Sequence, residues 1–263
     1  MGRCLSFIHV HLANAADAIL RKQLLTALLV FALSACGKPR ATETAHWPDW
    51  RGPTADGHSA ATGLPLHWSE KENILWKIPI HDIGHSTPVI TGNTIWLTTA
   101  TKTGDSLFAI GVDLASGEVV HDVELFKPAE RQMSHTLNTF ATPSPVVEEG
   151  RAYVHFGTYG TACLDSNSGK TLWARDDLHC NHFQGPASSP VLYDNLLILA
   201  FMGFDVQFLI ALDKNSGKTV WRKDGPTEFY SNLPEGSFPQ SYATPVVFNV
   251  DGKSCLVNNS SKG

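Results

Sequence analysis

The sequence predicts an all-β chain made of repeated four-stranded antiparallel sheets, and three observations carry this prediction. A motif of serine or threonine, proline and valine occurs four times, at Thr87–Val89, Ser144–Val146, Ser189–Val191 and Thr244–Val246. A turn motif Asp-x-x-x-Gly occurs at Asp113–Gly117, Asp165–Gly169 and Asp213–Gly217. The intervening residues are strand-like, and no segment shows sustained helical periodicity. A repeat of about 50 residues with such contents indicates a β-propeller, in which four-stranded blades repeat around an axis.

The composition is that of an ordinary globular protein. The 263 residues are 43% hydrophobic and 17% charged, which is enough apolar material for a sizeable core. The formal net charge is −5, whereas a nucleic-acid-binding protein usually presents a basic face. We therefore expect no nucleic-acid partner.

The first residues predict export. Arg21 and Lys22 precede an apolar run over residues 24–33, which is too short to span a bilayer. A basic start, a short apolar run and small residues at a cleavage site are typical of a secretory signal. We therefore interpret residues 1–36 as a signal peptide.

The end of this signal resembles the lipobox of bacterial lipoproteins. The residues are Leu33–Cys36, and in that family the cysteine becomes the acylated first residue of the mature protein. The resemblance implies that Cys36 is lipidated, with residues 37–46 as a polar tether. Because Gly37 rather than an acidic residue follows, it also implies an outer-membrane anchor facing the periplasm. A plain cleaved signal with Cys36 merely nearby is the alternative.

Residues 47–72 contain tryptophans in a loop-like stretch, and we expect an arm packed on the domain surface. The next segment, Asn73–Ile80, is predicted to be one strand, because its Trp76 copies the tryptophan of a later outer strand, Lys170–Trp173. An additional outer strand at the start of an array can complete the last blade, which ring closure requires.

Each unit then repeats one plan, which the second unit shows best. Ser144–Val147 is predicted to be the first strand, with proline at its start, where no ladder donor is lost. Ala152–Phe156 and Thr161–Leu164 follow, and the Asp165–Gly169 turn leads to the outer strand. The corresponding strands of the first and third units are Thr94–Leu97, Leu107–Ile110, Leu196–Leu199 and Phe208–Leu212.

The fourth unit supplies two predicted strands, one within Tyr242–Val247 and one at Lys253–Val257. Residues 47–263 are therefore expected to hold about three and a half blades, as part of a ring of about seven or eight. A small four-bladed ring closed by the Trp76 strand is the alternative.

The repeated residues have predicted structural roles. The aspartate caps the turn, and the glycine takes a left-handed conformation in a bulged hairpin. Val120 stands where the first unit is expected to carry the outer-strand tryptophan, so we expect looser packing there. The structural repeat residues are Asp113, Gly117, Asp165, Gly169, Trp173, Asp213, Gly217 and Trp221.

Five polar residues are candidates for ligand binding. Residues that precede a first strand tend to line the mouth of a propeller, which makes His85, His135 and His182 candidates. Asp205 and Gln207 lie between two strands of the third unit and could contribute to a cation or sugar site. No nucleophile elbow and no His-Glu-x-x-His pair occurs, so we assign no catalytic residue.

One further cluster contains metal-binding residue types. His179–His182 could supply zinc ligands, but no second paired cluster accompanies it, and we predict no metal site. Cys163, Cys180 and Cys255 are an odd number and lie far apart, which leaves their disulfide state open. Cys163 falls in a predicted strand, where it is expected to be a small core residue.

The repeats resemble those of the pyrroloquinoline-quinone (PQQ) repeat superfamily. The resemblance rests on the Asp-x-x-x-Gly turns, on the outer-strand tryptophans and on four further stretches, Trp47–Pro53, His85–Val89, Phe156–Gly160 and Asp205–Phe208. The resemblance implies the propeller fold over roughly residues 47–257 but no particular activity, because function lies in sites grafted on the fold.

Two branches of the superfamily imply different functions. The quinoprotein dehydrogenases hold PQQ and calcium and carry an adjacent cysteine pair, which this sequence lacks. The other branch is similar to the propeller lipoprotein of outer-membrane protein assembly, a lipid-anchored scaffold without a cofactor. The signal and the bare repeats match this second branch.

The resemblance therefore implies an exported, lipid-anchored binding or scaffold module of the bacterial envelope, without a cofactor and without catalysis of its own. Its partner would be a protein or polymer of the envelope. One alternative is a PQQ-dependent dehydrogenase whose calcium and quinone ligands lie in further blades. A second is a carbohydrate-binding propeller that uses Trp50, Trp68 and Tyr159.

Overall fold

A computed structural model describes residues 46–225, 237 and 239–259. The predicted signal peptide, Cys36 and residues 37–45 of the predicted tether lie outside the described residues. Within the described ranges, no helix has the length and apolar character needed to cross a membrane.

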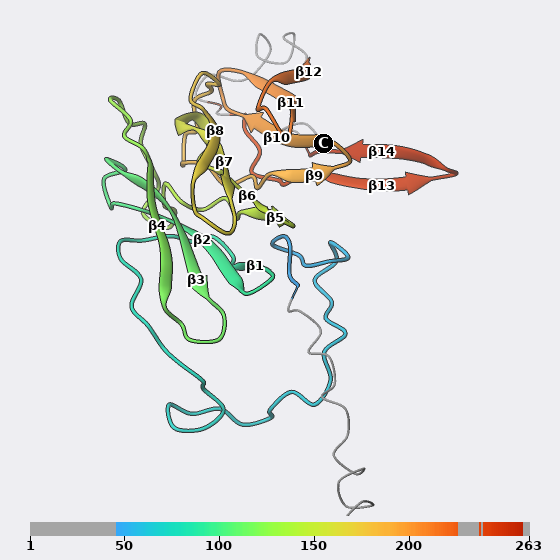
Figure 1. The fold of residues 1–263 in the computed structure, drawn as a ribbon. Helices are drawn as coiled ribbons and strands as arrows, with labels where there is room; N and C mark the ends of the chain where they lie inside the picture. Colours follow the sequence, from blue (N-terminus) through green and yellow to red (C-terminus); the bar gives the residue numbers. More distant parts are fainter. Residues whose placement is uncertain (1–45, 226–236, 238, 260–263) are drawn as a thin grey trace, which may run out of the picture. The chain divides into compact units, whose positions relative to one another are not determined.

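The described residues form three four-stranded antiparallel sheets and one two-stranded sheet (Figure 1). Blade 1 contains β1 (Val89–Thr91), β2 (Thr94–Ala100), β3 (Leu107–Asp113) and β4 (Val119–Phe126). Blade 2 contains β5 (Val146–Glu148), β6 (Arg151–His155), the 3-10 turn η1 (Gly157–Tyr159), β7 (Thr161–Asp165) and β8 (Thr171–Arg175). Blade 3 contains β9 (Val191–Tyr193), β10 (Leu196–Met202), β11 (Gln207–Asp213) and β12 (Thr219–Asp224). The last pair is β13 (Val246–Val250) and β14 (Lys253–Val257).

This architecture confirms the predicted all-β propeller with about three and a half blades. In each full blade the strands are hydrogen-bonded in sequence order, as the repeat predicted. Each strand of a blade starts and ends within a few residues of its predicted bounds.

The predicted strand at Asn73–Ile80 is wrong, because these residues form no ladder with any described strand. A strand needs a neighbour for its backbone groups, and the segment has none there. Its tryptophan does make the contacts of an outer-strand tryptophan. The Trp76 indole N–H donates to the carbonyl oxygen of Leu114 at 3.0 Å, and its ring covers Gly117 of the first turn.

The three Asp-x-x-x-Gly turns adopt one geometry. In the second turn, Asp165 Oδ1 accepts hydrogen bonds from the amides of Asn167 and Ser168 at 3.1 and 2.8 Å. The hydroxyl of Ser168 donates to the same oxygen, and these bonds lower the pKa of Asp165. Gly169 has φ +70°, a conformation that favours glycine because it has no Cβ. The hairpin prediction for these turns is confirmed.

The outer-strand tryptophan joins one blade to the next. Trp173 of blade 2 covers Gly217 of blade 3, and its indole N–H donates to the Lys214 carbonyl at 2.9 Å. Trp76 makes the same pair of contacts with the turn of blade 1. Each of these two turns is therefore closed by an aromatic side chain from the preceding part of the chain.

In blade 1 the residue at the tryptophan position is His121, not Val120. His121 pairs with Gly111 across the sheet, as Trp173 pairs with Cys163, so the predicted position is wrong by one residue. The His121 ring covers Gly169 of the next turn and stacks on Trp96 at 5.3 Å. An imidazole therefore replaces the indole at this joint.

The hydroxyl residue before each repeated proline forms a second inter-blade joint. The amide of Thr87 donates to Ser144 Oγ at 2.8 Å, and the amide of Ser144 donates to Ser189 Oγ at 3.0 Å. The amide of Ser189 in turn donates to Thr244 Oγ1 at 3.0 Å. We call this series the hydroxyl ladder. It explains why the repeat requires serine or threonine at this position.

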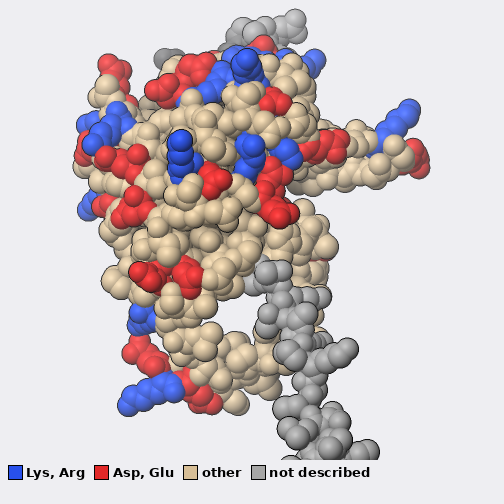
Figure 2. Space-filling view, viewed as in Figure 1, with Lys and Arg blue, Asp and Glu red and all other residues tan. Residues whose placement is uncertain are grey.

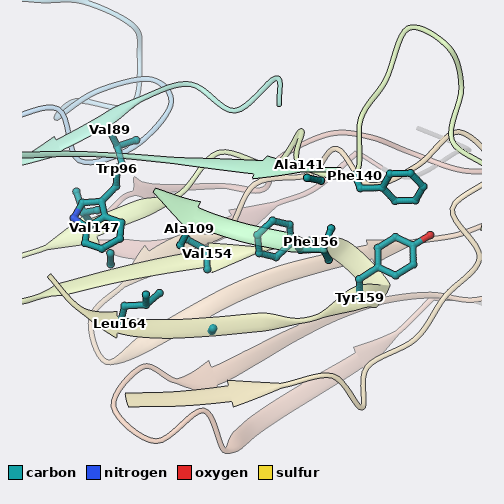
Figure 3. Close-up of a cluster of buried hydrophobic side chains, with 14 residues drawn as sticks. Val89, Trp96, Ala109, Phe140, Ala141, Val147, Val154, Phe156, Tyr159 and Leu164 are labelled. Atoms are coloured by element: carbon teal, nitrogen blue, oxygen red, sulfur yellow. The ribbon is translucent and has the colours of Figure 1, made fainter. Parts of the chain in front are cut away.

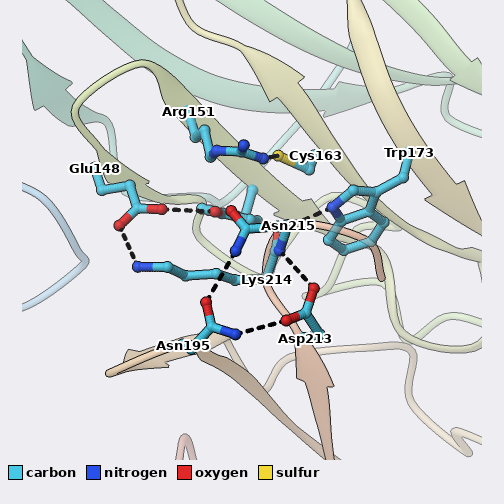
Figure 4. Close-up of polar contacts among 9 residues, drawn as sticks. Glu148, Arg151, Cys163, Trp173, Asn195, Asp213, Lys214 and Asn215 are labelled. Atoms are coloured by element: carbon cyan, nitrogen blue, oxygen red, sulfur yellow. Dashed lines mark hydrogen bonds and ion pairs between the residues drawn. The ribbon is translucent and has the colours of Figure 1, made fainter. Parts of the chain in front are cut away.

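A polar network also ties blade 2 to blade 3 (Figure 4). Glu148 accepts a hydrogen bond from the Tyr153 hydroxyl and forms an ion pair with Lys214, both at 2.7 Å. Asn195 donates to Asp213 at 2.6 Å and so holds the turn that contains Lys214. The network gives this blade interface a polar component.

The core lies between adjacent sheets (Figure 3). One buried cluster joins blades 1 and 2 through Trp96, Leu107, Val154 and Phe156. A second joins blades 2 and 3 around Tyr153, Cys163, Leu199 and Phe208. Blade 2 is covered on both faces by its neighbours, and its central strands are almost continuously buried. Cys163 is buried in β7, as predicted, and the three described cysteines are unpaired.

Candidate functional site

One hollow lies among the loops at one end of blades 1 to 3. We call it the loop pocket, and its volume is about 720 Å³. Four segments line it, namely 126–132 after β4, Thr158 and Tyr159 of η1, residues 176 and 179–181 after β8, and Asp205 between β10 and β11. These segments connect different blades, so the fold itself brings them together.

Gln132 is the hub of the pocket wall. Its Nε2 donates to the Cys180 carbonyl at 2.9 Å, and its Oε1 accepts from the His182 amide at 2.7 Å. Its own amide donates to the Tyr159 hydroxyl at 3.0 Å. One residue thus fixes two loops against η1. No sequence signal pointed to this role, because Gln132 belongs to no repeat motif.

Asp205 lines the loop pocket, and its predicted role in ligand binding stays a prediction. Its Oδ1 accepts from the amides of Asn181 and Val206 at 2.7 and 2.8 Å. These bonds orient the carboxylate, while Oδ2 accepts none from the described residues. Asp205 can therefore accept a further hydrogen bond from a ligand.

His182 lies in the wall rather than in the pocket. It is buried, and its Nε2 accepts a hydrogen bond from the Thr158 amide at 3.2 Å, which requires the proton on Nδ1. Burial lowers the pKa of His182 to about 4, so the imidazole is neutral near pH 7. Its role here is to hold η1, and ligand contact by His182 stays a prediction.

Cys180 beside it is not an activated nucleophile. Its Sγ lies 3.3 Å from His182 Nε2, but burial raises the pKa of the thiol well above its usual value. A neutral thiol beside a neutral imidazole is unreactive, because the thiolate is the nucleophile. In the described ranges, no three His, Cys, Asp or Glu side chains are grouped to hold a metal ion.

Carboxylate groups in the lining of the loop pocket are available to accept hydrogen bonds from a ligand. Lys127 and Arg131 also line the pocket, and each pairs with an acidic residue outside the lining, Lys127 with Glu124 at 2.8 Å and Arg131 with Asp105 at 3.2 Å. Glu130 and Asp176 line the pocket without an ion-pair partner among the described residues. Figure 2 shows acidic and basic side chains interspersed over one face of the molecule.

The remaining candidates lie apart from the loop pocket. Gln207 is buried, and its Nε2 donates to the carbonyls of Gly203 and Pro239 at 3.3 and 3.1 Å. His135 accepts from the Leu137 amide at 3.1 Å, and His85 is exposed just before blade 1 begins. None of these three side chains lines the pocket.

The aromatic residues suggested for carbohydrate binding are not assembled into one site. Tyr159 is only 6% exposed, and its hydroxyl accepts from the Gln132 amide. Trp50 lines a different hollow, the arm groove, which has a volume of about 510 Å³ and lies beside β9 and β13. Trp68 lines neither hollow.

The dehydrogenase branch of the superfamily would require a quinone site with calcium. Calcium is held by several oxygen ligands, typically carboxylates. The residues that the structure describes contain no group of three His, Cys, Asp or Glu side chains placed to hold a metal ion, and the sequence has no adjacent cysteine pair. The absence of this cofactor stays a prediction.

Repeated blades joined by Asp-x-x-x-Gly turns and outer-strand aromatic residues define a β-propeller of the PQQ-repeat class. Residues 68–261 match a family model described as "Outer membrane protein assembly factor BamB". The match covers more than half of the chain, which therefore belongs to this family. No protein of curated function matches it.

Several solved structures resemble the chain. BamB from Moraxella catarrhalis is 20% identical, with a TM-score of 0.47, over 68% of this chain and 48% of that one. A europium-containing methanol dehydrogenase is 18% identical, with a TM-score of 0.43, over 56% and 26%. Quinohemoprotein alcohol dehydrogenase from Comamonas testosteroni is 16% identical, with a TM-score of 0.40, over 54% and 21%. The chain thus spans less than half the length of each.

Proposed function

We propose that the chain is an exported, lipid-anchored binding module of the bacterial envelope, without catalysis or a cofactor of its own. Its family supports an envelope role, because that family is described by an outer-membrane protein assembly factor. The N-terminal signal and Cys36 support the anchor. The partner is a protein or polymer of the envelope.

The observation that carries this proposal is the loop pocket. Its walls are fixed before any partner arrives, because Gln132 and Asp205 together make three hydrogen bonds between different loops. A preformed site binds without the entropic cost of ordering its loops. Burial raises the pKa of the Cys180 thiol in the pocket lining well above its usual value, so this thiol is not poised to act as a nucleophile.

The pocket also indicates the chemistry of the partner. Glu130, Asp176 and Asp205 offer carboxylate oxygens, and the two cations of the lining, Lys127 and Arg131, each already have an acidic partner. A partner that donates hydrogen bonds, such as lysine or arginine side chains or backbone amides, would complement this lining.

Site-specific photo-crosslinking in cells tests the proposal. A benzophenone amino acid at Glu130 or Asp176 should give one discrete adduct in the envelope fraction. The same probe at Lys170, an exposed residue at the other end of blade 2, is the control and should give none. Equal adducts at all three positions, or none at the pocket, would contradict the proposal.

The anchor has its own test. The Cys36→Ala variant should lose labelling by a clickable palmitate analogue and move from the membrane to the soluble fraction. Unchanged membrane association would refute lipidation at Cys36.

The proposed lack of a cofactor is tested by adding PQQ and calcium to the purified full chain. We expect no heat of binding and no alcohol-dependent dye reduction. A stoichiometric quinone complex would overturn this part of the proposal and favour the dehydrogenase alternative.

A further inference from the structure

The first strand of each blade is an edge strand, and the structure shows what covers two of these edges. The Trp47 amide donates to the Ile90 carbonyl of β1 at 3.0 Å, and the Ile90 amide donates to the Trp47 carbonyl at 2.8 Å. The Val147 amide of β5 donates to the Pro48 carbonyl at 2.8 Å. The arm therefore pairs with blades 1 and 2 through main-chain bonds.

The corresponding positions in β9 and β13 are Leu192 and Val247. Leu192 pairs with Leu197 as Ile90 pairs with Ile95, one pair from the hairpin turn, and Val247 pairs with Leu256, three pairs from its turn, an odd number in each case. Backbone groups alternate in direction along a strand, so equivalent residues point their N–H and C=O to the same, outward side. No hydrogen bond to these outward groups comes from the described residues.

Leu192 and Val247 both line the arm groove. Residues 49–51, 53 and 55 of the arm also line it. The groove also presents Trp50, Tyr193 and Phe248, of which Trp50 is 41% and Phe248 is 44% exposed. Among the described residues that line it, only Asp49 and Arg51 carry a carboxylate or a basic side chain, one of each sign.

We propose that the arm groove binds an extended segment of a partner protein, which adds to β9 and β13 as the arm adds to β1 and β5. Unsatisfied edge groups beside apolar side chains are the features that β-strand addition uses. Because side chains alternate along a strand, the segment should carry uncharged apolar residues at every second position. This proposal rests on the proposed binding function and names the chemistry of one partner.

Hydrogen exchange of the free, full-length protein gives the first test. The amides of Leu192 and Val247 should exchange at least about 10-fold faster than those of Ile90 and Val147, because only the latter pair is hydrogen-bonded to the arm. Equal protection at all four amides would mean that the edges are already covered, and the proposal would fail.

Peptide binding gives the second test. A random 12-residue display library selected against the full chain should yield peptides with alternating apolar residues, and a selected peptide should slow exchange at Leu192 and Val247. Phe248→Asp should weaken that peptide by at least about 10-fold, the scale of one lost contact at the centre of an interface. Val250→Asp is the matched control, since Val250 is similarly exposed on the same hairpin but does not line the groove.

Three results would overturn the proposal. One is a selection that yields no peptides with apolar residues at alternate positions. Another is a selected peptide that leaves the Leu192 and Val247 amides unprotected, or whose affinity is unchanged by Phe248→Asp. The third is a concentration-dependent dimer that protects both amides without peptide, which would make a second copy of the chain the occupant. Crosslinking at the loop pocket is unaffected by these outcomes, because Glu130 and Asp176 do not line the groove.

Discussion

At the scale of single residues, His182 stabilises its contact with η1 only when its imidazole is neutral. Its Nε2 accepts the Thr158 amide proton, and a protonated imidazole has no acceptor to offer. Its own amide is held by Gln132. The contact of this ring with η1 therefore lasts only while the imidazole stays neutral.

This contact predicts an acid sensitivity. Burial lowers the pKa of His182 from 6.5 to about 4, so its stabilising contribution is complete above pH 6.5 and is lost as pH falls through about 4. A difference of one in pKa between the folded and unfolded states corresponds to about 1.4 kcal/mol of stability. Urea unfolding measured from pH 7 to pH 4 should show a loss of stability that His182→Gln reduces.

His179→Gln is the matched control, because His179 is an exposed residue of the same loop. It should leave the pH slope of the wild type unchanged. Burial also lowers the pKa of His155, to about 3, so part of the slope should remain in His182→Gln, and a slope that persists in full would assign the acid sensitivity to another group.

At the scale of elements, the hydroxyl ladder predicts a specific pair of variants. Ser189→Ala removes the acceptor of the buried Ser144 amide and should destabilise the protein by about 1–3 kcal/mol. Ser189→Thr keeps a hydroxyl, as Thr244 does at the next position, and should cost much less. Urea unfolding measures both, and exchange of the Ser144 amide should accelerate in the alanine variant alone. An equal loss of unfolding free energy in the two variants would show that side-chain packing, and not the hydroxyl acceptor, causes the effect.

The aromatic joint predicts a second element-scale effect. Trp173→Ala deletes the indole that covers Gly217 and donates to Lys214, and should destabilise the protein by about 3 kcal/mol. Leu172→Ala, a neighbour on the exposed side of β8, should change the unfolding free energy by less than about 0.5 kcal/mol. Similar values for the two variants would contradict the proposed joint.

Local signals explain which elements could be predicted. The turn at Asp165–Gly169 is encoded by its own residues, because the aspartate caps it and the glycine tolerates positive φ. The segment Asn73–Ile80 has the same local signal as an outer strand, but a strand also needs a partner, which no local pattern reports. His121 was missed because an imidazole in place of tryptophan breaks the pattern that located the others.

At the scale of the whole molecule, the joints link neighbouring blades. Arrays of this kind gain stability from each unit and from nearest-neighbour interfaces. Trp76→Ala removes one joint, the contact of the 73–80 segment with the first turn. Limited proteolysis should then cleave this segment faster, while exchange in β10 and β11 stays as in the wild type. A global acceleration of exchange would show that the arm is coupled to every blade.

The candidate site was predicted less completely than the fold. Asp205 was identified because a carboxylate between two strands must lie in a connecting loop, and it does line the loop pocket. Gln132 was not, because its importance comes from three loops that meet only after folding. The three described cysteines are an odd count without a pairing pattern, and all are free. Sites that several blades share are set by tertiary contacts, which the repeat pattern does not contain.

The hydroxyl ladder also bears on how such a chain can change over generations. Every rung is made by one serine or threonine that accepts from the equivalent amide one unit earlier. Copying or deleting one entire unit in the gene therefore leaves no amide stranded, because the new neighbours present the same donor and the same acceptor. Insertions of half a unit break that match, so lineages of this architecture should differ in size by whole modules.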